Sequence, residues 1–465
     1  MGTPHTAITG GIVVNDTWSG PATVLIAGRQ IVALVDPSAK LPPSVQQVIA
    51  AGGRLVLPGG VDPHCHVKTE MGSYTTLDDY GEATSAAIWG GTTTIVDFAI
   101  PTPGQTPWDA VTERLKLASL AKCDTALHGC VTEWEEDTAD QLAEMAKIGV
   151  RTVKLFTTYR DSVMATSDTV LKVMQCLSEL GGIAYIHAES NHLVEAAHEH
   201  ALAREEMSAA YHSKTRPEHT EEAAVSEILN IAEALGSHAY FVHQSTPRAV
   251  ELVREARARG VLAYSETCPH YLLMNNERYA EDQPERYVCC PPLRSPETMR
   301  GLRESVIRQE VQTIGSDHNC FDLKQKLACR DDVRHMPNGM PGVELRLPLI
   351  FSELAVRGSM HPQALVAMLC ANPARLNGIY PRKGVIAPGA DADVVILNTD
   401  TCAPVAVNNL HMATDYSPFE GVELRASVET VLVGGQVVLR DGAMVDNEVR
   451  GRQLESAPSS ATLLC

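Results

Sequence analysis

Residues 55–66 read LVLPGGVDPHCH, and this segment is the most informative part of the chain. Its apolar start, Leu55-Val56-Leu57, is bounded by Pro and Gly and therefore predicts a buried strand. His64 and His66 lie where that strand ends. Side chains alternate along a strand, so residues two positions apart point the same way and the two imidazoles would converge. Converging imidazoles indicate a site for a divalent metal ion.

Short apolar strands recur along the chain after Arg54, and helical patterns lie between them. Eight strands that alternate with helices predict a parallel sheet of the α/β class, in its simplest form a TIM-like (β/α)8 barrel. The predicted strands are 55–61, 92–99, 125–131, 152–157, 183–188, 239–243, 262–266 and 313–317, and the predicted helices include 109–121, 137–148, 167–180, 221–235 and 246–259.

Both ends of the chain predict β structure outside this barrel. Residues 8–14 and 22–35 alternate apolar residues with Gly and Asn turns, and the pattern returns in 391–397 and in 428–439 around Gly434-Gly435. We therefore expect three parts, namely a smaller β-sandwich-like domain from 1–53 with 384–448, a catalytic barrel over 54–383, and a flexible polar tail over 449–465.

The composition is that of an ordinary globular protein. Of 465 residues, 44% are hydrophobic and 20% are charged, and the formal net charge is −19. Such an acidic surface disfavours nucleic acids and anionic membranes. No apolar run reaches membrane-spanning length, and the first residues lack the pattern of a signal peptide. Twelve scattered cysteines without a CxxC pair predict reduced thiols, and we expect a cytoplasmic protein.

Polar residues collect at or near the carboxyl ends of the predicted strands, where barrel enzymes place their active sites. Taken singly, each has an ordinary explanation as a satisfied polar residue or a turn former. Lys154 is the exception, because a lysine among apolar strand residues is costly unless it is paired or modified. The other members of this set are His64, His66, His187, His243 and Asp317.

The combination of these motifs resembles the amidohydrolase superfamily, specifically its dihydropyrimidinases and hydantoinases. The resemblance covers roughly residues 10–442. The segments that carry it are PGGVDPHCH (58–66), GGTTTIVDF (90–98), KLF (154–156) with Tyr159, ETCPHYL (266–272), PPLR (291–294), GSDH (315–318), PNG (337–339) and DYSPFEG (415–421).

The resemblance implies a centre of two divalent ions, with zinc as the expected metal, and a lysine carbamylated by CO2. A neutral amine offers one lone pair, whereas a carbamate offers two anionic oxygens, one for each ion. One ion would be held by His64, His66, carbamylated Lys154 and Asp317, and the other by Lys154, His187 and His243. A hydroxide shared by the two ions would attack the ring carbonyl of a small cyclic amide, such as a dihydropyrimidine or a 5-substituted hydantoin, and give an N-carbamoyl amino acid.

The resemblance also assigns roles around the substrate. Asp317 would accept the proton of the hydroxide and pass it to the leaving nitrogen, and Tyr159 would donate a hydrogen bond to the oxyanion. Cys290, where relatives usually carry Ser, and Asn338 would bind the ring through backbone atoms. His270 and His318 would be supporting residues. Relatives are commonly tetramers, so a homo-oligomer is expected.

Three alternatives remain open from the sequence. A non-catalytic relative would have lost ligands, but every ligand position is filled here. A dihydroorotase or an allantoinase typically continues from His-x-His into Arg-Glu-Pro-Gly, whereas this chain reads VKTEMG over residues 67–72, with Lys68 as the one basic residue that could imitate the arginine. A single-metal deaminase of the superfamily would not need Lys154. Neither the ring substituent nor the enantiomer can be predicted.

Overall fold

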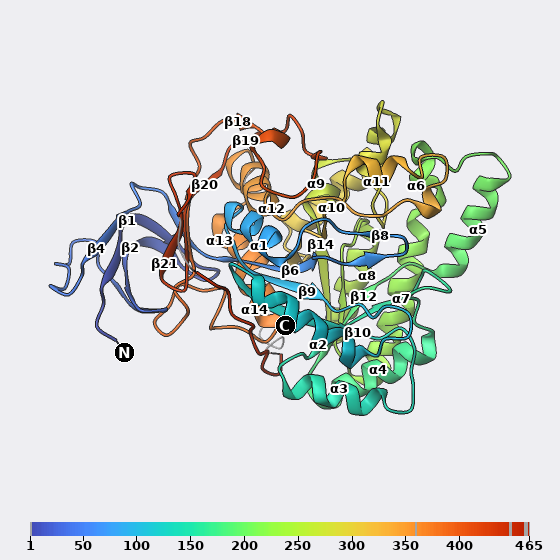
Figure 1. The fold of residues 1–465 in the computed structure, drawn as a ribbon, viewed down its shortest axis with the longest axis horizontal. Helices are drawn as coiled ribbons and strands as arrows, with labels where there is room; N and C mark the ends of the chain where they lie inside the picture. Colours follow the sequence, from blue (N-terminus) through green and yellow to red (C-terminus); the bar gives the residue numbers. More distant parts are fainter. Residues whose placement is uncertain (1, 359, 446–448, 460–463, 465) are drawn as a thin grey trace.

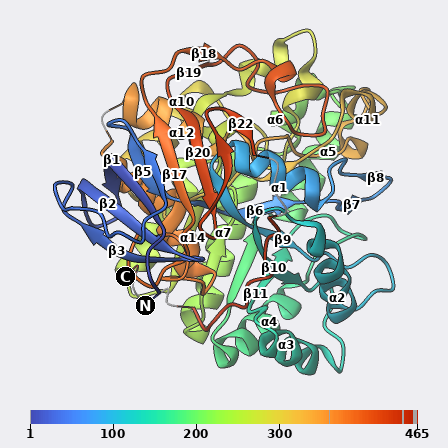
Figure 2. The same cartoon turned by 60° about the vertical axis from the view of Figure 1, so that its left-hand side comes forward.

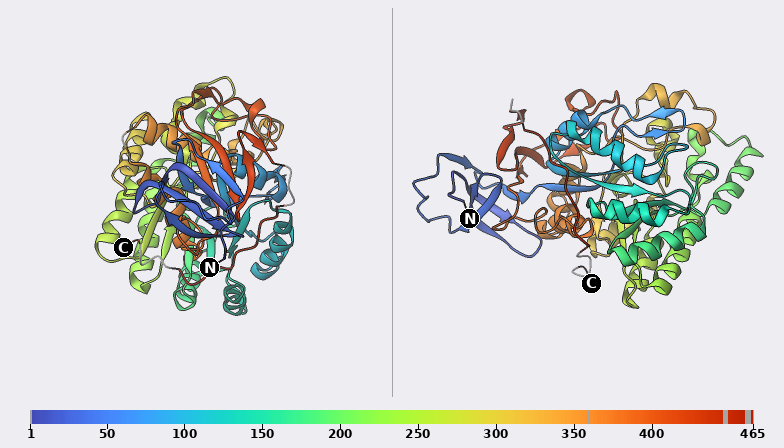
Figure 3. Two further views of the ribbon diagram at one scale, coloured as in Figure 1. Left: turned by 90° about the vertical axis from the view of Figure 1, so that its left-hand side faces the viewer. Right: turned by 60° about the horizontal axis from the view of Figure 1, so that its bottom comes forward.

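The computed structural model describes residues 2–358, 360–445, 449–459 and 464. Two large sheets organise these residues. One sheet forms a barrel surrounded by helices, and the other lies beside it at one end of the molecule (Figures 1 and 3).

The barrel sheet is parallel throughout and closes on itself, which confirms the predicted fold class. The eighth strand position of the barrel is divided between two short strands. β15 pairs with β14 and β16 pairs with β6, so residues 313–319 connect the two edges of the sheet. The strands are β6 (Gly60–His66), β9 (Thr92–Phe98), β10 (Asp124–Cys130), β11 (Thr152–Phe156), β12 (Ile183–His187), β13 (Ala239–Phe241), β14 (Ala263–Thr267), β15 (Thr313–Ile314) and β16 (His318–Asn319).

Helices cover the outside of the barrel and begin and end at residues that suit those positions. In α4 (Ser167–Leu180), the Thr166 side chain accepts from the amide of Thr169, and Gly181 ends the helix in the left-handed region. The longer helices are α1 (Tyr80–Trp89), α2 (Pro107–Leu117), α3 (Thr138–Lys147), α4, α5 (Asn191–Leu202), α7 (Glu218–Leu235), α8 (Pro247–Ala258) and α10 (Pro296–Ile307). The shorter ones are α6 (His212–Thr215), α9 (Pro269–Leu273), α11 (Leu323–Leu327), α12 (Arg346–Ile350), α13 (Pro362–Val366) and α14 (Asn372–Leu376).

Both chain ends contribute strands to the second sheet, as expected. The amino-terminal and carboxyl-terminal strands lie side by side in Figure 2, in the order β22-β21-β20-β17-β5-β1-β2-β3, with β4 also paired to β1. Its strands are β1 (Thr6–Val14), β2 (Ser19–Ala27), β3 (Gln30–Val35), β4 (Gln47–Ala50), β5 (Leu55–Pro58), β17 (Val394–Asn398), β20 (Ser427–Val433), β21 (Gln436–Arg440) and β22 (Ala443–Met444). Two small two-stranded sheets complete the fold, β7 (Glu70–Met71) with β8 (Tyr74–Thr75) and β18 (Ala403–Pro404) with β19 (Glu423–Leu424).

The predicted strand 55–61 is two strands, and this corrects the domain boundary at residue 54. Residues of β5 pair with β1 and β17 in the second sheet, whereas β6 begins at Gly60 and pairs with β9 in the barrel. The chain crosses between the sheets at Gly59. A Cβ at Gly59 would lie 2.0 Å from Thr93 Oγ1, so only glycine allows this close passage.

The segment after residue 448 is not a loose tail over the residues that the structure describes. Its backbone bonds to barrel loops and to strand β10, including Leu454 N to Thr125 O at 2.7 Å and Ser456 N to Gly149 O at 3.0 Å. The polar composition suggested flexibility, but backbone pairing does not depend on apolar side chains. The remainder of the predicted tail, 460–463 and 465, lies outside the described residues.

Candidate metal centre

The six predicted ligands meet inside the barrel and come from five of its strand positions, with two of the histidines on the same strand. His64 and His66 end β6, Lys154 lies in β11, His187 ends β12, His243 follows β13, and Asp317 lies between β15 and β16. Each is at most 5% exposed. The carboxyl ends of parallel strands share one end of a barrel, and this is why residues distant in sequence converge here.

Three of these side chains offer atoms close enough for one ion. Ligand atoms of His64, His243 and Asp317 all lie within 4.8 Å of one another. His64 Nε2 lies 3.2 Å from His66 Nε2, and Asp317 Oδ1 lies 3.1 Å from the former and 3.5 Å from the latter. Two imidazole nitrogens and a carboxylate oxygen that crowd one point match the donor set of a zinc-like ion.

The fourth histidine joins the group through ring contacts. The His187 and His243 rings have centroids 4.6 Å apart, and the His64 and His243 rings have centroids 5.3 Å apart. The structure thus brings all four imidazoles together beside Asp317.

Carboxylates behind the histidines determine which ring nitrogen is free. His64 Nδ1 lies 2.7 Å from Glu266 Oε1, and this contact leaves Nε2 for an ion. His187 Nε2 lies 2.7 Å from Glu189 Oε2, so Nδ1 is the free nitrogen there. Such outer carboxylates orient ligand histidines in metal sites. In the described chain the buried Nδ1 atoms of His66 and His243 have no hydrogen-bond partner.

Lys154 is buried against aromatic rings. Its amine lies 4.6 Å from the centre of the Phe98 ring and 4.9 Å from that of Phe156. Burial lowers the pKa of this amine to about 8, although the carboxylates of Asp317 and Glu266 oppose the shift. Reaction with CO2 requires the neutral amine, and the lowered pKa increases the neutral fraction near neutral pH. The residues present therefore fit a centre of two divalent ions that share a carbamylated lysine.

The pKa values of Asp317 and His66 are both shifted from their usual values. Burial opposes ionisation of Asp317, but the His64 and His66 imidazoles outweigh it and hold the pKa of this carboxyl well below its usual range. Burial lowers the pKa of His66 to about 4, which favours a neutral, metal-binding imidazole.

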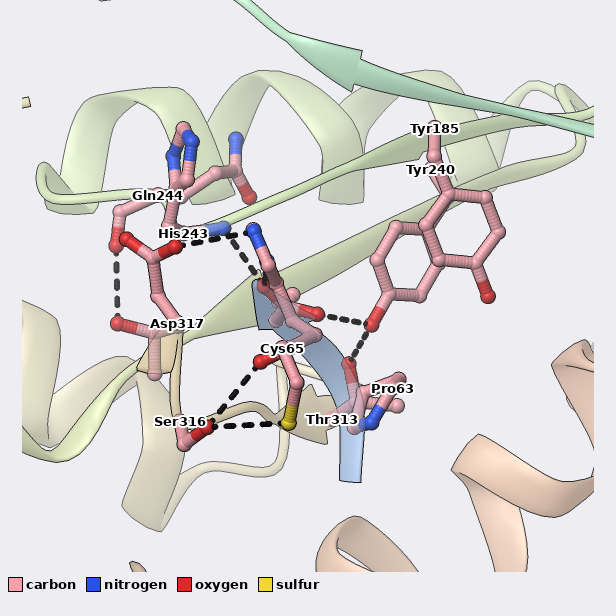
Figure 4. Close-up of polar contacts among 12 residues, drawn as sticks. Pro63, Cys65, Tyr185, Tyr240, His243, Gln244, Thr313, Ser316 and Asp317 are labelled. Carbon is pink, nitrogen blue, oxygen red and sulfur yellow. Dashed lines mark hydrogen bonds and ion pairs between the residues drawn. The ribbon is translucent and has the colours of Figure 1, made fainter. Parts of the chain in front are cut away.

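Asp317 is fixed by the strand segment on either side of it. The Ser316 hydroxyl donates to the His64 carbonyl at 3.1 Å and lies 3.7 Å from Cys65 Sγ (Figure 4). Asn319 Nδ2 donates to the Asp317 carbonyl at 3.0 Å and to Oδ1 at 3.2 Å. Asp317 is therefore tied to strand β6, which carries two of the histidines.

Tyr159 lies beside the cluster in the loop after β11. Its ring centroid is 5.3 Å from that of His187, and the Arg216 guanidinium lies 4.8 Å over its ring. Burial raises the pKa of its phenol well above the usual value, with a further contribution from Cys290, which shares a hydrogen bond with it. The phenol therefore stays protonated and can donate.

Supporting residues lie around these groups, and several were not predicted. His318 behaves as predicted: its Nε2 lies 2.6 Å from Asp78 Oδ2, and its Nδ1 accepts from the amide of Gly342. His270 is buried, and its Nε2 has no partner in the described chain. The roles of Glu266, Glu189 and Arg216 were not predicted. The sequence did contain a signal for Glu189, because it is a carboxylate two residues after the strand-end histidine His187.

Comparison with known proteins identifies the family to which this chain is similar. A profile described as the amidohydrolase family matches residues 55–438. A D-hydantoinase of Streptomyces coelicolor is 34% identical over 94% of this chain and 95% of its own length. A D-hydantoinase of Geobacillus stearothermophilus is 33% identical over 98% of this chain and 97% of its own length.

Comparison with solved structures finds similar folds in proteins named hydantoinase or dihydropyrimidinase. The dihydropyrimidinase from Brevibacillus agri superposes with a TM-score of 0.94 at 32% identity, over 98% of this chain and 99% of that one. The L-hydantoinase from Arthrobacter aurescens superposes with a TM-score of 0.90 at 26% identity, over 97% of this chain and 99% of that one. The fold is therefore common to this chain and these hydantoinase and dihydropyrimidinase structures, and the chain belongs to the amidohydrolase family.

Proposed function

We propose that this enzyme hydrolyses the cyclic amide bond of dihydropyrimidines or 5-substituted hydantoins and releases N-carbamoyl amino acids. The observation that carries the proposal is the convergence of four buried histidines, Asp317 and the buried Lys154 at one end of the barrel. The names of the relatives, hydantoinase and dihydropyrimidinase, support this class of substrate.

The proposed centre holds two divalent ions, with zinc as the expected metal. One ion would bind His64, His66 and Asp317, the other would bind His187 and His243, and carbamylated Lys154 would contribute one oxygen to each. Ions bound there would supply a Lewis acid for the ring carbonyl and a water molecule with a lowered pKa.

The side chains of this chain perform the remaining steps of the proposed mechanism. Water adds to the ring carbonyl carbon and the bond from this carbon to the ring nitrogen breaks. Asp317 accepts the proton of the attacking water and returns it to the leaving nitrogen. The hydroxyl of Tyr159, which burial keeps protonated, donates to the developing oxyanion.

Backbone groups of two loops are proposed to hold the ring. Within the described chain, the amide and carbonyl groups of Cys290 and Asn338 take part in no hydrogen bond. Free backbone donors and acceptors are costly when buried, and a cyclic amide edge carries the complementary groups. The Ser-to-Cys difference at position 290 does not affect a contact made by the backbone.

Residue 68 argues against the rival cyclic amidases. Lys68 is exposed, so it does not replace the arginine that follows the His-x-His motif of dihydroorotases and allantoinases. A substrate panel of dihydrouracil, hydantoin, a 5-substituted hydantoin, allantoin and dihydroorotate tests the assignment. We expect the highest kcat/KM among the first three, with product confirmed by mass spectrometry. The highest value on allantoin or dihydroorotate would refute the substrate class and leave the family unchanged.

Assembly and location are also proposals. We propose a homotetramer by similarity to the family, which light scattering of the purified protein tests. No helix among the described residues is long and apolar enough to cross a bilayer. The eleven cysteines that the structure describes are free thiols, which suits the reducing cytoplasm proposed for this protein.

A further inference from the structure

Lys326 is a second wholly buried lysine, and the metal centre does not use it. It lies on α11 and is 0% exposed. Its Nζ donates to the carbonyl of Val288 at 2.8 Å and to the carbonyl of Pro337 at 3.1 Å. A buried amine is costly unless it is hydrogen-bonded, so these two carbonyls explain how the site accommodates it.

The two carbonyls belong to the two loops that are proposed to hold the substrate ring. Val288 lies two residues before Cys290, and Pro337 directly precedes Asn338. The loops are also joined directly, because the amide of Gly339 donates to the Val288 carbonyl at 3.1 Å. Lys326 thus ties together two segments that are about fifty residues apart in the sequence and carry the proposed ring contacts.

Other carbonyls in the first loop are already occupied. The carbonyl of Cys289 lies 2.7 Å from His212 Nε2, and the carbonyl of Pro291 accepts from the Tyr271 hydroxyl at 2.6 Å. Within the described residues, Cys290 is the one position between 288 and 291 whose carbonyl has no such partner. The carbonyls on either side of Cys290 are therefore hydrogen-bonded, whereas the carbonyl of Cys290, which is proposed to bind the substrate, has no partner among the described residues.

The helix that carries Lys326 is itself anchored. Asp322 and Gln325 form a reciprocal cap at its start, with Asp322 Oδ1 accepting from the amide of Gln325 at 2.7 Å. Gln325 Nε2 also donates to the carbonyl of Thr75 in β8 at 3.0 Å. In Figure 1, α11 lies in the upper part of the barrel domain. A short, capped and tethered helix provides a rigid support for a clamp.

We propose that Lys326 is a positioning residue that fixes the spacing between the free backbone groups of Cys290 and Asn338, and so governs binding of the cyclic amide. This inference rests on the proposed function for the identity of the ligand. Among the described residues, Lys326 forms its hydrogen bonds with Val288 and Pro337 and none with a proposed metal ligand. Its loss should therefore weaken substrate binding and leave the metal centre and the chemical step nearly intact.

The test compares Lys326→Met, which removes the donor, with Lys326→Gln, which keeps a donor on a side chain of the same length as Met; both are one atom shorter than lysine. We expect Lys326→Met to raise KM about tenfold with kcat within about threefold of the wild type, and Lys326→Gln to raise KM less. Metal content should not change. If Lys326→Met does not fold, the KM of Lys326→Gln decides the question.

Lys383→Met is the matched control. Lys383 is another buried lysine, but it pairs with Asp124 at 2.6 Å and Asp393 at 2.5 Å, away from both loops. Its loss should lower the melting temperature and leave KM unchanged. A similar rise in KM in this control, or a fall in kcat at constant KM in the Lys326 variants, would overturn the positioning role.

A second readout does not depend on the substrate. Amide hydrogen exchange of 286–293 and 336–340 should accelerate in the Lys326 variants and not in Lys383→Met. If the wild type opens no cyclic amide, the proposed function fails, whereas the exchange result still decides whether Lys326 ties the loops. Unchanged exchange in both loops would refute the clamp even in an active hydantoinase.

Discussion

Replacing Glu189 by Gln should weaken one half of the metal centre without removing a ligand. Glu189 is wholly buried, and its Oε2 lies 2.7 Å from both His187 Nε2 and Arg216 Nη1. The carboxylate therefore holds the histidine in the form that leaves Nδ1 free and neutralises the buried guanidinium. The neutral amide of Gln can accept a hydrogen bond from one of these two groups, but it carries no negative charge to pair with the guanidinium.

The expected effect of Glu189→Gln has two parts, one on metal affinity and one on folding stability. Loss of an outer carboxylate behind a ligand histidine typically costs 10- to 100-fold in metal affinity, which corresponds to about 1.4–2.7 kcal/mol. Loss of one partner of a buried ion pair costs about 3–5 kcal/mol of folding stability. Since the Gln side chain fills the same space, we expect a stability loss of about 3 kcal/mol, at the lower end of that range. Arg216 also lies over the Tyr159 ring, so kcat at saturating metal should fall as well.

Metal affinity is measured by competition with a chelator, and stability by denaturant unfolding of the metal-free proteins. Glu195→Gln is the control, because Glu195 pairs with Arg160 at 2.7 Å on the surface, where both side chains are 42% exposed. That change should cost less than about 1 kcal/mol and leave metal affinity unchanged. Equal metal affinity in Glu189→Gln and the wild type would refute the assignment of His187 as a ligand oriented by Glu189.

Three further predictions address the reacting groups. Lys154→Ala should lose metal and activity together, because the bridging ligand is removed; metal analysis would contradict this if two ions remained, and a crystal structure of the wild type should show the added carboxylate on Lys154. Tyr159→Phe should keep its metal, while turnover falls about 10²–10³-fold for the loss of one oxyanion donor; a wild-type kcat would make Tyr159 a packing residue. Asp317→Asn should retain some metal but be nearly inactive on every ring. Steady-state assays that show near wild-type turnover in this variant would assign the proton transfer to another residue, with His318 as the next candidate.

The barrel and the convergence of the candidate ligands were predictable because both depend on local patterns and one geometric rule, whereas their assignment as metal ligands came from the family resemblance. Short apolar strands alternate with helices, and the predicted helix 167–180 coincides with α4. Once the strands are parallel, the residues at their carboxyl ends must meet. His64, His187 and Asp317 therefore converge although the sequence separates them widely.

The residues that hold the site in place could not be predicted in this way. Glu189 and Arg216 are 27 positions apart, and Lys326 and Val288 are 38 positions apart. Each contact joins different strand-helix units, and hydrophobic periodicity carries no information about such pairs. The division of 55–61 was missed for a related reason, since a strand that changes sheets at a glycine has the same apolar pattern as one continuous strand.

Backbone conformation at the centre shows how rigidly these residues are held. Tyr159, His243 and Asp317 have φ angles of 72°, 39° and 48°, in the left-handed region that costs a non-glycine residue about 1–3 kcal/mol. Such conformations persist when surrounding contacts determine them. Glu266 provides one of these contacts, because its Oε1 accepts from the backbone amide of His243 at 3.0 Å and also lies 2.7 Å from His64 Nδ1. One carboxylate on β14 thus fixes both a strained backbone after β13 and an imidazole on β6, and so it positions residues that are proposed to bind different ions.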